Sequence, residues 1–333
     1  MNRRGFLSLA AASALASRGK GAEPLAGMGV ATTSYLSFWR PRDTLEFLEH
    51  CHAMGAAGIQ SAIHGDPAKI RSRAEELGMY VEAMVPMPEN GSAEPLEKAL
   101  QAAREAGATA LRTGMLHGRR YITFKTLAEW EEWEKRARAS IEQALPLLDR
   151  YRIPLGIENH KDWTADQLAE LLEKHSSEYL GACLDFGNNI SLLDDPMYVA
   201  RKLAPHAVVT HVKDMGVSPT DDGFLLSEVP LGTGILDLQA MIDLVRQARA
   251  HTRFTLEMIT RDPLPVACLN DAYWTTFPDR GGIYLARTLR LVHDYQSATP
   301  LPVVSNLPRE QQLAEEDTNV RTCLVFAREK LKV

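Results

Sequence analysis

Short apolar runs alternate with longer amphipathic segments along most of the chain after residue 28. The apolar runs have the length of buried strands, whereas the longer segments repeat apolar side chains at the spacing of a helix face. The runs predict strands at residues 29–33, 57–62, 80–85, 109–113, 154–158, 180–185, 207–212 and 254–258. The amphipathic segments predict helices at residues 42–54, 67–77, 95–106, 127–150, 164–174, 196–203, 238–249 and 282–293.

Eight predicted strands, each followed by a predicted helix, indicate an α/β protein with a parallel sheet. About 250 residues take part, which is the usual size of a (β/α)₈ TIM barrel. A doubly wound open sheet is the alternative. The glycine-rich fingerprint of dinucleotide-binding folds does not follow the first predicted strand, so the barrel is the favoured fold.

Two segments lie outside this repeat. Residues 261–280 form a long loop after the eighth predicted strand, and such loops cover the active face of a barrel. Residues 298–333 predict a proline-rich linker followed by a C-terminal helix with one apolar side. We therefore expect a barrel at residues 28–297 and a C-terminal extension that packs on the barrel or on a second subunit of a homo-oligomer.

The first 22 residues predict an export signal. Arg3 and Arg4 precede the apolar stretch 6–16, which is shorter than the roughly 20 residues of a bilayer span. Ala14-Leu15-Ala16 fits a cleavage site, and the paired arginines resemble a twin-arginine signal. We expect a periplasmic or otherwise extracytoplasmic protein, with an uncleaved amphipathic start as the alternative. No later segment has about 18 uninterrupted apolar residues, so no membrane association is expected after cleavage.

The composition is that of a globular protein, with 45% hydrophobic and 24% charged residues among 333. Acidic residues number 43 and basic residues 37, so the net charge of −6 argues against nucleic acid as a partner. The four cysteines lie far apart in the sequence, which argues against metal ribbons and CxxC redox motifs. We expect reduced thiols in apolar packing, with a Cys268–Cys323 disulfide as the alternative.

Candidate chemistry concentrates at the ends of the last four predicted strands. Glu158, Asp185, His211 and Glu257 each follow an apolar run, at the point where the strand gives way to its loop. A single acid at a strand end usually caps a helix or pairs with a basic side chain. The C-terminal ends of strands five to eight are neighbours in a barrel, however, so these four side chains are expected to converge.

Three converging carboxylates repel one another unless a cation neutralises them. Two glutamates, one aspartate and one histidine form a mixed oxygen–nitrogen set. Such a set suits Mn²⁺, Mg²⁺ or Co²⁺ in open octahedral geometry and can also hold Zn²⁺. The sequence therefore predicts a divalent-metal site with about two positions left for water or substrate.

These motifs resemble the xylose-isomerase-like barrel superfamily, often called the sugar phosphate isomerases/epimerases. The resemblance is carried by Ile157-Glu158-Asn159-His160, Leu184-Asp185-Phe186-Gly187-Asn188, His211-Val212-Lys213-Asp214, Leu256-Glu257 and the segment Pro230-Leu231-Gly232-Thr233-Gly234. It covers residues 28–295. The combined motifs are specific for the superfamily and not for a substrate.

The resemblance implies one divalent ion, Mn²⁺ before the others, held by the four predicted ligands. In ketose epimerases the two glutamates shuttle protons through a metal-stabilised enediolate, a catalytic role that falls here on Glu158 and Glu257. A metal polarises the carbonyl, and a carboxylate on each face removes and returns a proton. The implied activity is isomerisation or epimerisation of a keto-sugar or related polyol. Because export is predicted, we expect a small unphosphorylated carbohydrate as the substrate, with an oxidised carbohydrate among the options.

Departures from the epimerase pattern keep a dehydratase or lyase as the alternative. Ketose epimerases carry a histidine where this chain has Asn188 and Asn189, and an arginine beyond the strand-seven histidine that is missing near His211. The segment from His211 to Asp214 looks closer to inosose-dehydratase-like enzymes, which share the enolate step but expel a β-leaving group. Lys213 is expected to stabilise the enolate or assist the leaving group, with a salt bridge to Asp214 as the alternative.

Three further histidines are candidates for the pocket. His160 follows Glu158 by two residues and shares its face of the barrel top. We predict an acid/base or positioning role for His160, with a loop cap as the alternative. His64 and His117 follow the second and fourth predicted strands, where they are expected to line the pocket.

Two tryptophans and one buried acid complete the candidates. Trp39 and Trp274 are predicted either to stack on a sugar or to anchor their loops. Glu82 lies within the third predicted strand, where a buried carboxylate needs a partner, and Arg112 is the expected one. We interpret that pair as structural.

Two other function classes remain as alternatives, a DNA-repair nuclease and a non-enzymatic sugar-binding protein. Nucleases on this barrel use several metals and more histidines at the strand ends. Net acidity, predicted export and few strand-end histidines argue against that class. The presence of both Glu158 and Glu257 argues against a binding protein.

Overall fold

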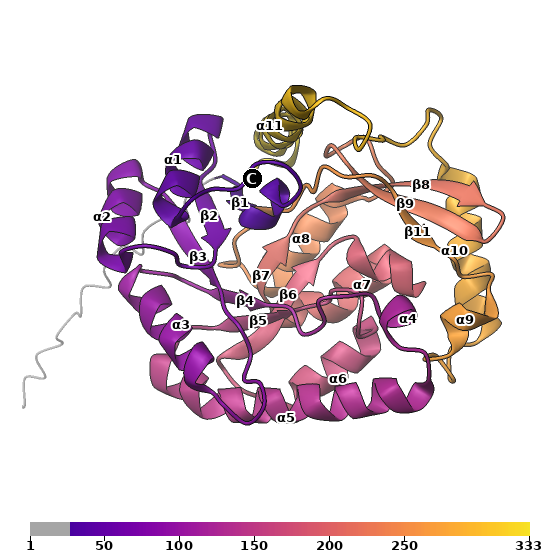
Figure 1. Ribbon diagram of the computed structural model, residues 1–333, viewed down its shortest axis with the longest axis horizontal. Coiled ribbons are helices and arrows are strands. Elements are labelled where there is room, and N and C mark those ends of the chain that lie inside the picture. Colours follow the sequence, from indigo (N-terminus) through magenta and orange to yellow (C-terminus); the bar gives the residue numbers. More distant parts are fainter. Residues whose placement is uncertain (1–26) are drawn as a thin grey trace, which may run out of the picture.

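In the computed structural model, which describes residues 27–333, eight short parallel strands form a barrel with helices around it (Figure 1). In spatial order the barrel strands are β10 (Thr255–Leu256), β1 (Gly29–Ala31), β2 (Gly58–Ser61), β3 (Tyr80–Met84), β4 (Leu111–Thr113), β5 (Leu155–Glu158), β6 (Leu180–Asp185) and β7 (Ala207–His211). A parallel bridge between Val212 and Leu256 joins the two outer strands. The predicted (β/α)₈ TIM barrel is confirmed. The predicted export signal, residues 1–22, lies outside the described residues.

Polar caps fix the start of most helices of the barrel. These helices are α1 (Thr44–Met54), α2 (Pro67–Leu77), α3 (Glu94–Glu105), α5 (Leu127–Tyr151), α6 (Ala165–His175), α7 (Pro196–Leu203) and α8 (Leu238–Ala248), with a short α4 (Arg120–Thr123) before α5. The Asp43 carboxylate accepts the N–H of Glu46 at 2.8 Å at the start of α1, and Thr164 and Gln167 form a capping box at α6. Because these groups satisfy N–H donors that have no partner inside the helix, they set the first turn.

A second sheet, which the sequence analysis did not predict, lies beside the barrel (Figure 1). β8 (Asp214–Thr220) and β9 (Gly223–Val229) form an antiparallel hairpin soon after β7. β11 (Leu264–Val266), from the long loop after β10, pairs with β9. Gly223 closes the hairpin with a φ of +147°, and a Cβ atom there would lie 2.3 Å from the carbonyl oxygen of Val266. This position therefore requires glycine.

The C-terminal helix packs on its own barrel. α11 (Arg309–Phe326) contacts α1 and β10, and the turn that follows it, Ala327–Leu331, reaches α8. Glu316 on α11 is fully buried and accepts the backbone N–H groups of Phe38 at 3.0 Å and Trp39 at 2.7 Å. The predicted C-terminal extension is therefore present, and of its two expected packing partners the barrel is the one observed.

α10 (Gly282–Tyr295), which the repeat predicted as the helix after the eighth strand, packs against β8 of the second sheet. The short α9 (Asp271–Trp274) lies in the loop before it. α10 and the second sheet share an apolar cluster that is separate from the barrel core. Between the eighth barrel strand, β10, and α11, the chain therefore forms β11, α9 and α10, and α11 then packs on the barrel.

No helix among residues 27–333 is long and apolar enough to cross a membrane. All four cysteines are buried with free thiols, so the expected reduced thiols are observed and the alternative Cys268–Cys323 disulfide is not. Burial raises the pKa of Cys268 to about 11 and that of Cys323 to about 12, which keeps both thiols protonated at neutral pH.

We expect Glu316→Ala to lower the free energy of unfolding by about 1–3 kcal/mol, because it removes the acceptor of two partly buried backbone N–H groups. Urea unfolding followed by circular dichroism measures this loss. Glu310→Ala, at an exposed position of the same helix, is the matched control and is expected to change stability by less than about 0.5 kcal/mol. Equal effects of the two variants would show that Glu316 does not hold α11 on the barrel.

Candidate metal centre

The four predicted ligands meet at one end of the barrel. Glu158, Asp185 and His211 are the last residues of β5, β6 and β7, and Glu257 directly follows β10. The strand register places Asp185 opposite His211. All four residues are buried, with at most 3% of their surface exposed. The parallel arrangement explains this convergence, because every strand ends at the same rim.

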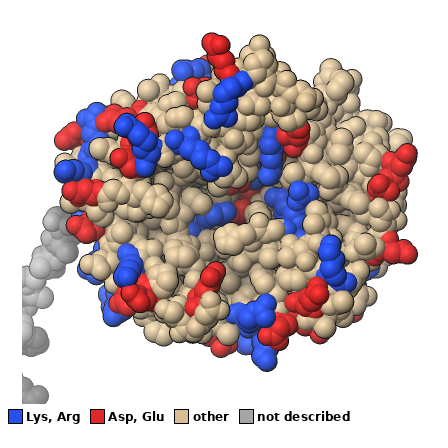
Figure 2. Space-filling view, in the orientation of Figure 1, with Lys and Arg blue, Asp and Glu red and all other residues tan. Residues whose placement is uncertain are grey.

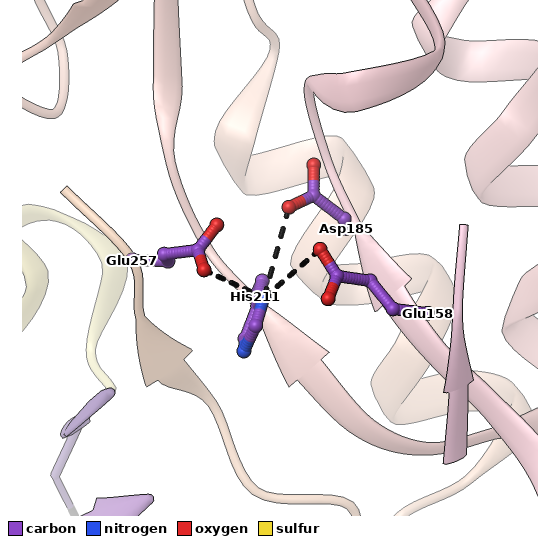
Figure 3. A group of neighbouring side chains, drawn as sticks. All are labelled: Glu158, Asp185, His211 and Glu257. Atoms are coloured by element: carbon purple, nitrogen blue, oxygen red, sulfur yellow. Dashed lines mark ion pairs between the residues drawn. The ribbon is translucent and has the colours of Figure 1, made fainter. Parts of the chain in front are cut away.

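The three carboxylates surround one nitrogen of the histidine (Figure 3). Nδ1 of His211 lies 3.5 Å from Oε1 of Glu158, 3.8 Å from Oδ2 of Asp185 and 3.3 Å from Oε1 of Glu257. One ligand atom from each of the four residues lies within 4.8 Å of the other three. Figure 3 shows Glu257 on one side of His211 and the other two carboxylates on the opposite side.

The hydrogen bonds of His211 leave this nitrogen free for a cation. The Gln60 amide nitrogen donates to Oε2 of Glu82 at 2.9 Å, so the Gln60 oxygen is the atom that faces Nε2 of His211, at 2.7 Å. Nε2 must therefore carry the hydrogen, and the lone pair of the neutral imidazole is on Nδ1. Nδ1 of His211 is buried without a hydrogen-bond partner among the described residues. The donor set and this free nitrogen fit a divalent metal ion.

The electrostatics of the group also call for positive charge at its centre. Burial disfavours a charged imidazole, yet the facing carboxylates of Glu257 and Glu158 raise the pKa of His211 to about 9. Burial raises the pKa of Glu158, but Arg112 and His211 together bring it far below its usual value. Three buried carboxylates are thus stable next to one another only because cations lie among them.

Two basic side chains supply part of this compensation. Nη2 of Arg112 donates to Oε2 of Glu158. Nζ of Lys213, a fully buried ammonium, lies 2.8 Å from Oδ2 of Asp185 and pairs with Oε2 of Glu257 as well. Lys213 therefore lies among the predicted ligands, as its proposed part in the reaction requires.

The alternative partner considered for Lys213 was wrong. Asp214 starts β8 and accepts the backbone N–H groups of Gly232 and Gly234, both at 2.9 Å, and of Leu236 at 3.1 Å. Its carboxylate thus shapes the Pro230–Gly234 segment, whereas the neighbouring Lys213 side chain points to the metal ligands.

The expected pair of Glu82 and Arg112 was also wrong. The register of β3 and β4 places Arg112 opposite Met84, two residues further along the strand than Glu82. Arg112 therefore reaches the ligands at the strand ends. Glu82 lies one level deeper, where Gln60 and Thr255 both donate to it at 2.9 Å. Burial raises the pKa of Glu82 to about 7, and among residues 27–333 no basic side chain forms an ion pair with it.

His160 is half-buried near the ligands, and its Nδ1 has no hydrogen-bond partner among the described residues. Burial and the neighbouring Lys161 ammonium lower the pKa of His160 to about 3, so its imidazole is neutral at physiological pH. Asn188, one of the departures from the epimerase pattern, donates from its amide nitrogen to Oε1 of Glu158 at 2.9 Å. It also accepts a hydrogen bond from the Lys161 ammonium.

The weaker candidates lie outside the buried group of ligands. His64 and His117 are exposed. Trp39 packs on Tyr35, with ring centroids 5.1 Å apart, and Trp274 donates from its indole nitrogen to the Cys268 carbonyl at 2.9 Å. Both tryptophans therefore anchor their loops.

Sequence reasoning missed several polar side chains that contact the ligands or their partners. They include Gln60, Arg112 in its role beside Glu158, and Lys161. A polar residue inside the apolar run of β2 was the available signal for Gln60, and adjacency to His160 was the signal for Lys161. In each case the partner depends on strand register, which the sequence alone does not give.

The structure defines a TIM barrel with a buried group of three carboxylates and one histidine at the strand ends, suited to a divalent metal. The chain belongs to the xylose isomerase-like TIM barrel family, which it matches over residues 48–275. The resemblance inferred from the motifs is thereby confirmed at the level of the family.

Three individual proteins illustrate the range of this similarity. The 3-oxo-isoapionate decarboxylase of Pectobacterium atrosepticum is 27% identical over 237 residues, which cover 66% of this chain and 81% of the relative. The structure of D-psicose 3-epimerase in the presence of D-fructose has a TM-score of 0.59 at 14% identity and covers 92% of this chain and 100% of its own. The IolI protein with a bound zinc atom has a TM-score of 0.54 at 13% identity, covering 81% and 99%. At this low identity, the similarity to these two structures shows that the chain shares their fold.

We expect wild-type protein purified without chelator to carry about one divalent ion per chain, and Asp185→Ala to lose it, because the substitution removes one of four ligands. Inductively coupled plasma mass spectrometry measures both the identity and the amount of metal. Asp221→Ala, at the exposed tip of the β8–β9 hairpin, is the matched control and should keep its metal. Metal at wild-type level in Asp185→Ala would remove this site as the place of binding.

Gln60→Met is expected to weaken metal binding about 10–100-fold, because it removes the group that orients the His211 ring and fixes its hydrogen on Nε2. Competition with a chromophoric chelator gives the affinity. Gln101→Met, on the exposed face of α3, serves as the control. An unchanged affinity in Gln60→Met, with the fold intact by circular dichroism, would contradict this orienting role.

Proposed function

We propose that this protein is a divalent-metal-dependent enzyme that forms an enolate from a keto-sugar and completes the reaction as a lyase. Four observations support the proposal: the buried ligand set, the family, the decarboxylase relative and the position of Lys213. The position of Lys213 is the observation that favours a lyase over an epimerase.

The Lys213 ammonium lies between two of the ligands, Asp185 and Glu257. An epimerase of the expected kind needs two carboxylates that are free to exchange protons on opposite faces of the substrate. Here Glu158 is held by Arg112, whereas Glu257 is held by Lys213 and also accepts the Thr33 hydroxyl at 2.6 Å. This arrangement suits cleavage of a bond to a leaving group better than two-base proton exchange. Lys213 is then placed to donate a proton.

The metal proposed for the site is Mn²⁺, with Mg²⁺, Co²⁺ and Zn²⁺ as the other options, because three of the four ligands are carboxylates. When bound, a divalent ion polarises a carbonyl and stabilises negative charge on its oxygen. The protein's own contribution is to hold Nδ1 of His211 toward that ion through Gln60. Arg112 neutralises Glu158 beside it.

A lyase reaction of this type breaks a bond close to the substrate carbonyl, and this can happen in two ways. Loss of carbon dioxide from a 3-oxo acid leaves the bonding electron pair on the substrate as the enolate, and a proton then returns to carbon. Loss of a β-leaving group begins instead with removal of a C–H proton, and the electron pair expels the leaving group. The 3-oxo-isoapionate decarboxylase relative supports the first of these outcomes.

Isomerisation or epimerisation of a keto-sugar, the activity first expected from the sequence, is the second candidate. Glu158 and Glu257 lie on opposite sides of His211 (Figure 3), as a two-carboxylate mechanism requires. The similarity of the fold to D-psicose 3-epimerase is compatible with it.

We expect Lys213→Met to reduce turnover at least about 100-fold while the protein keeps its metal, because the substitution removes a proton donor but no predicted ligand. The assay incubates metal-loaded protein with neutral keto-sugars and keto-sugar acids in D₂O and weighs the products by mass spectrometry. Lys98→Met, at an exposed position of α3, is the control.

The masses separate the two candidates. A product lighter by carbon dioxide, water or an aglycone supports the lyase. A product of unchanged composition with one solvent deuterium supports the epimerase or isomerase. Turnover of Lys213→Met within a few-fold of the control would contradict the role given to Lys213.

A further inference from the structure

Lys161 is a buried ammonium without an acidic partner. It lies three residues after the ligand Glu158, and only 5% of its surface is exposed. Among the described residues Nζ donates to the neutral side-chain oxygen of Asn188 and lies within ion-pair distance of no carboxylate. A buried charge with so little compensation is costly unless a ligand supplies the counter-charge.

The acidic groups nearest to Lys161 are already neutralised. Asp185 pairs with Lys213 at 2.8 Å, and Glu228 on β9 accepts Nε of Arg261 at 3.0 Å. Burial, Arg261 and Lys213 together lower the pKa of Lys161 to about 8. Among residues 27–333, no acidic side chain is therefore left at ion-pair distance to balance the Lys161 ammonium.

The same ammonium is linked to the metal ligands through one side chain. Asn188 accepts from Lys161 and donates to Oε1 of Glu158 at 2.9 Å. A divalent ion held by the four ligands would add further positive charge next to Glu158. Figure 2 shows basic side chains gathered with acidic ones in the hollow over the barrel strands. A neutral sugar would leave the positive charge of Lys161 unbalanced, whereas an anionic one would balance it.

We propose that Lys161 binds a carboxylate of the substrate, so that the enzyme acts on oxidised sugars that bear an acid group in preference to neutral keto-sugars. This inference rests on the proposed function, because it assigns a substrate class to the same site. Lys161 then acts as a specificity-determining residue: its ammonium recognises the acid group, and Asn188 holds that ammonium beside the metal ligands.

The test compares two six-carbon polyols that differ in one terminal group, D-gluconate and D-glucitol, by isothermal titration calorimetry on Mn²⁺-loaded protein. We expect wild type to bind gluconate at least about tenfold more tightly than glucitol, as a charge-assisted hydrogen bond in a buried site provides. Lys161→Met is expected to lose this preference to within about threefold, and Lys161→Arg to keep most of it. Lys161→Gln, which is neutral but hydrogen-bonding, is measured beside them in case the methionine variant does not fold.

Two outcomes would overturn the inference. One is equal binding of the two polyols by wild type. The other is a gluconate preference that survives in Lys161→Met or Lys161→Gln, which would assign the carboxylate to the metal. Metal content and product mass, measured on wild-type protein, test the proposed function separately. Equal binding of the two polyols by wild type, with metal bound and a lighter product formed, would therefore contradict only the substrate class.

Discussion

The mutual repulsion of three buried carboxylates is the constraint on which this structure depends. Glu158, Asp185 and Glu257 lie around one imidazole nitrogen at the end of a closed barrel, away from solvent. Such a group is stable only if positive charge is distributed among its members. Arg112 and Lys213 provide two positive charges from the side, and the negative charge that remains at the centre makes the group fit a divalent cation.

The polar groups outside the ligand set follow from the same constraint. Gln60 and Glu82 direct the lone pair of His211 toward the carboxylates, and Asn188 orients one carboxylate toward the centre. The Lys161 ammonium donates to Asn188 and forms no ion pair with an acidic side chain among the described residues. The negative charge of the site is therefore concentrated at the ligands, and the Lys161 ammonium places positive charge beside them, where we propose that a substrate anion binds. The metal ligands and the proposed binding site for the substrate anion are thus joined through the hydrogen bonds of Asn188.

The sequence predicted the features that depend on local periodicity. All eight barrel strands were found because each is a short apolar run, and the four ligands were found because they stand at or directly after the ends of the last four runs. The β8–β9 hairpin was missed although Asp221-Asp222-Gly223 is a turn signal between two alternating runs. Side-chain partners were missed for a different reason. They depend on strand register, which placed Arg112 two residues beyond Glu82.

The packing of α11 has a consequence for how the chain reaches its native state. Glu316 closes contacts with residues 277 and 278 positions earlier, and β10 pairs with β1 across a similar separation. While the polypeptide emerges from the ribosome, β1 cannot pair with β10 until most of the chain has been synthesised. Loop closure over such distances is slow and leaves an unpaired strand edge exposed to other chains. The barrel is thus most vulnerable to aggregation during its own synthesis.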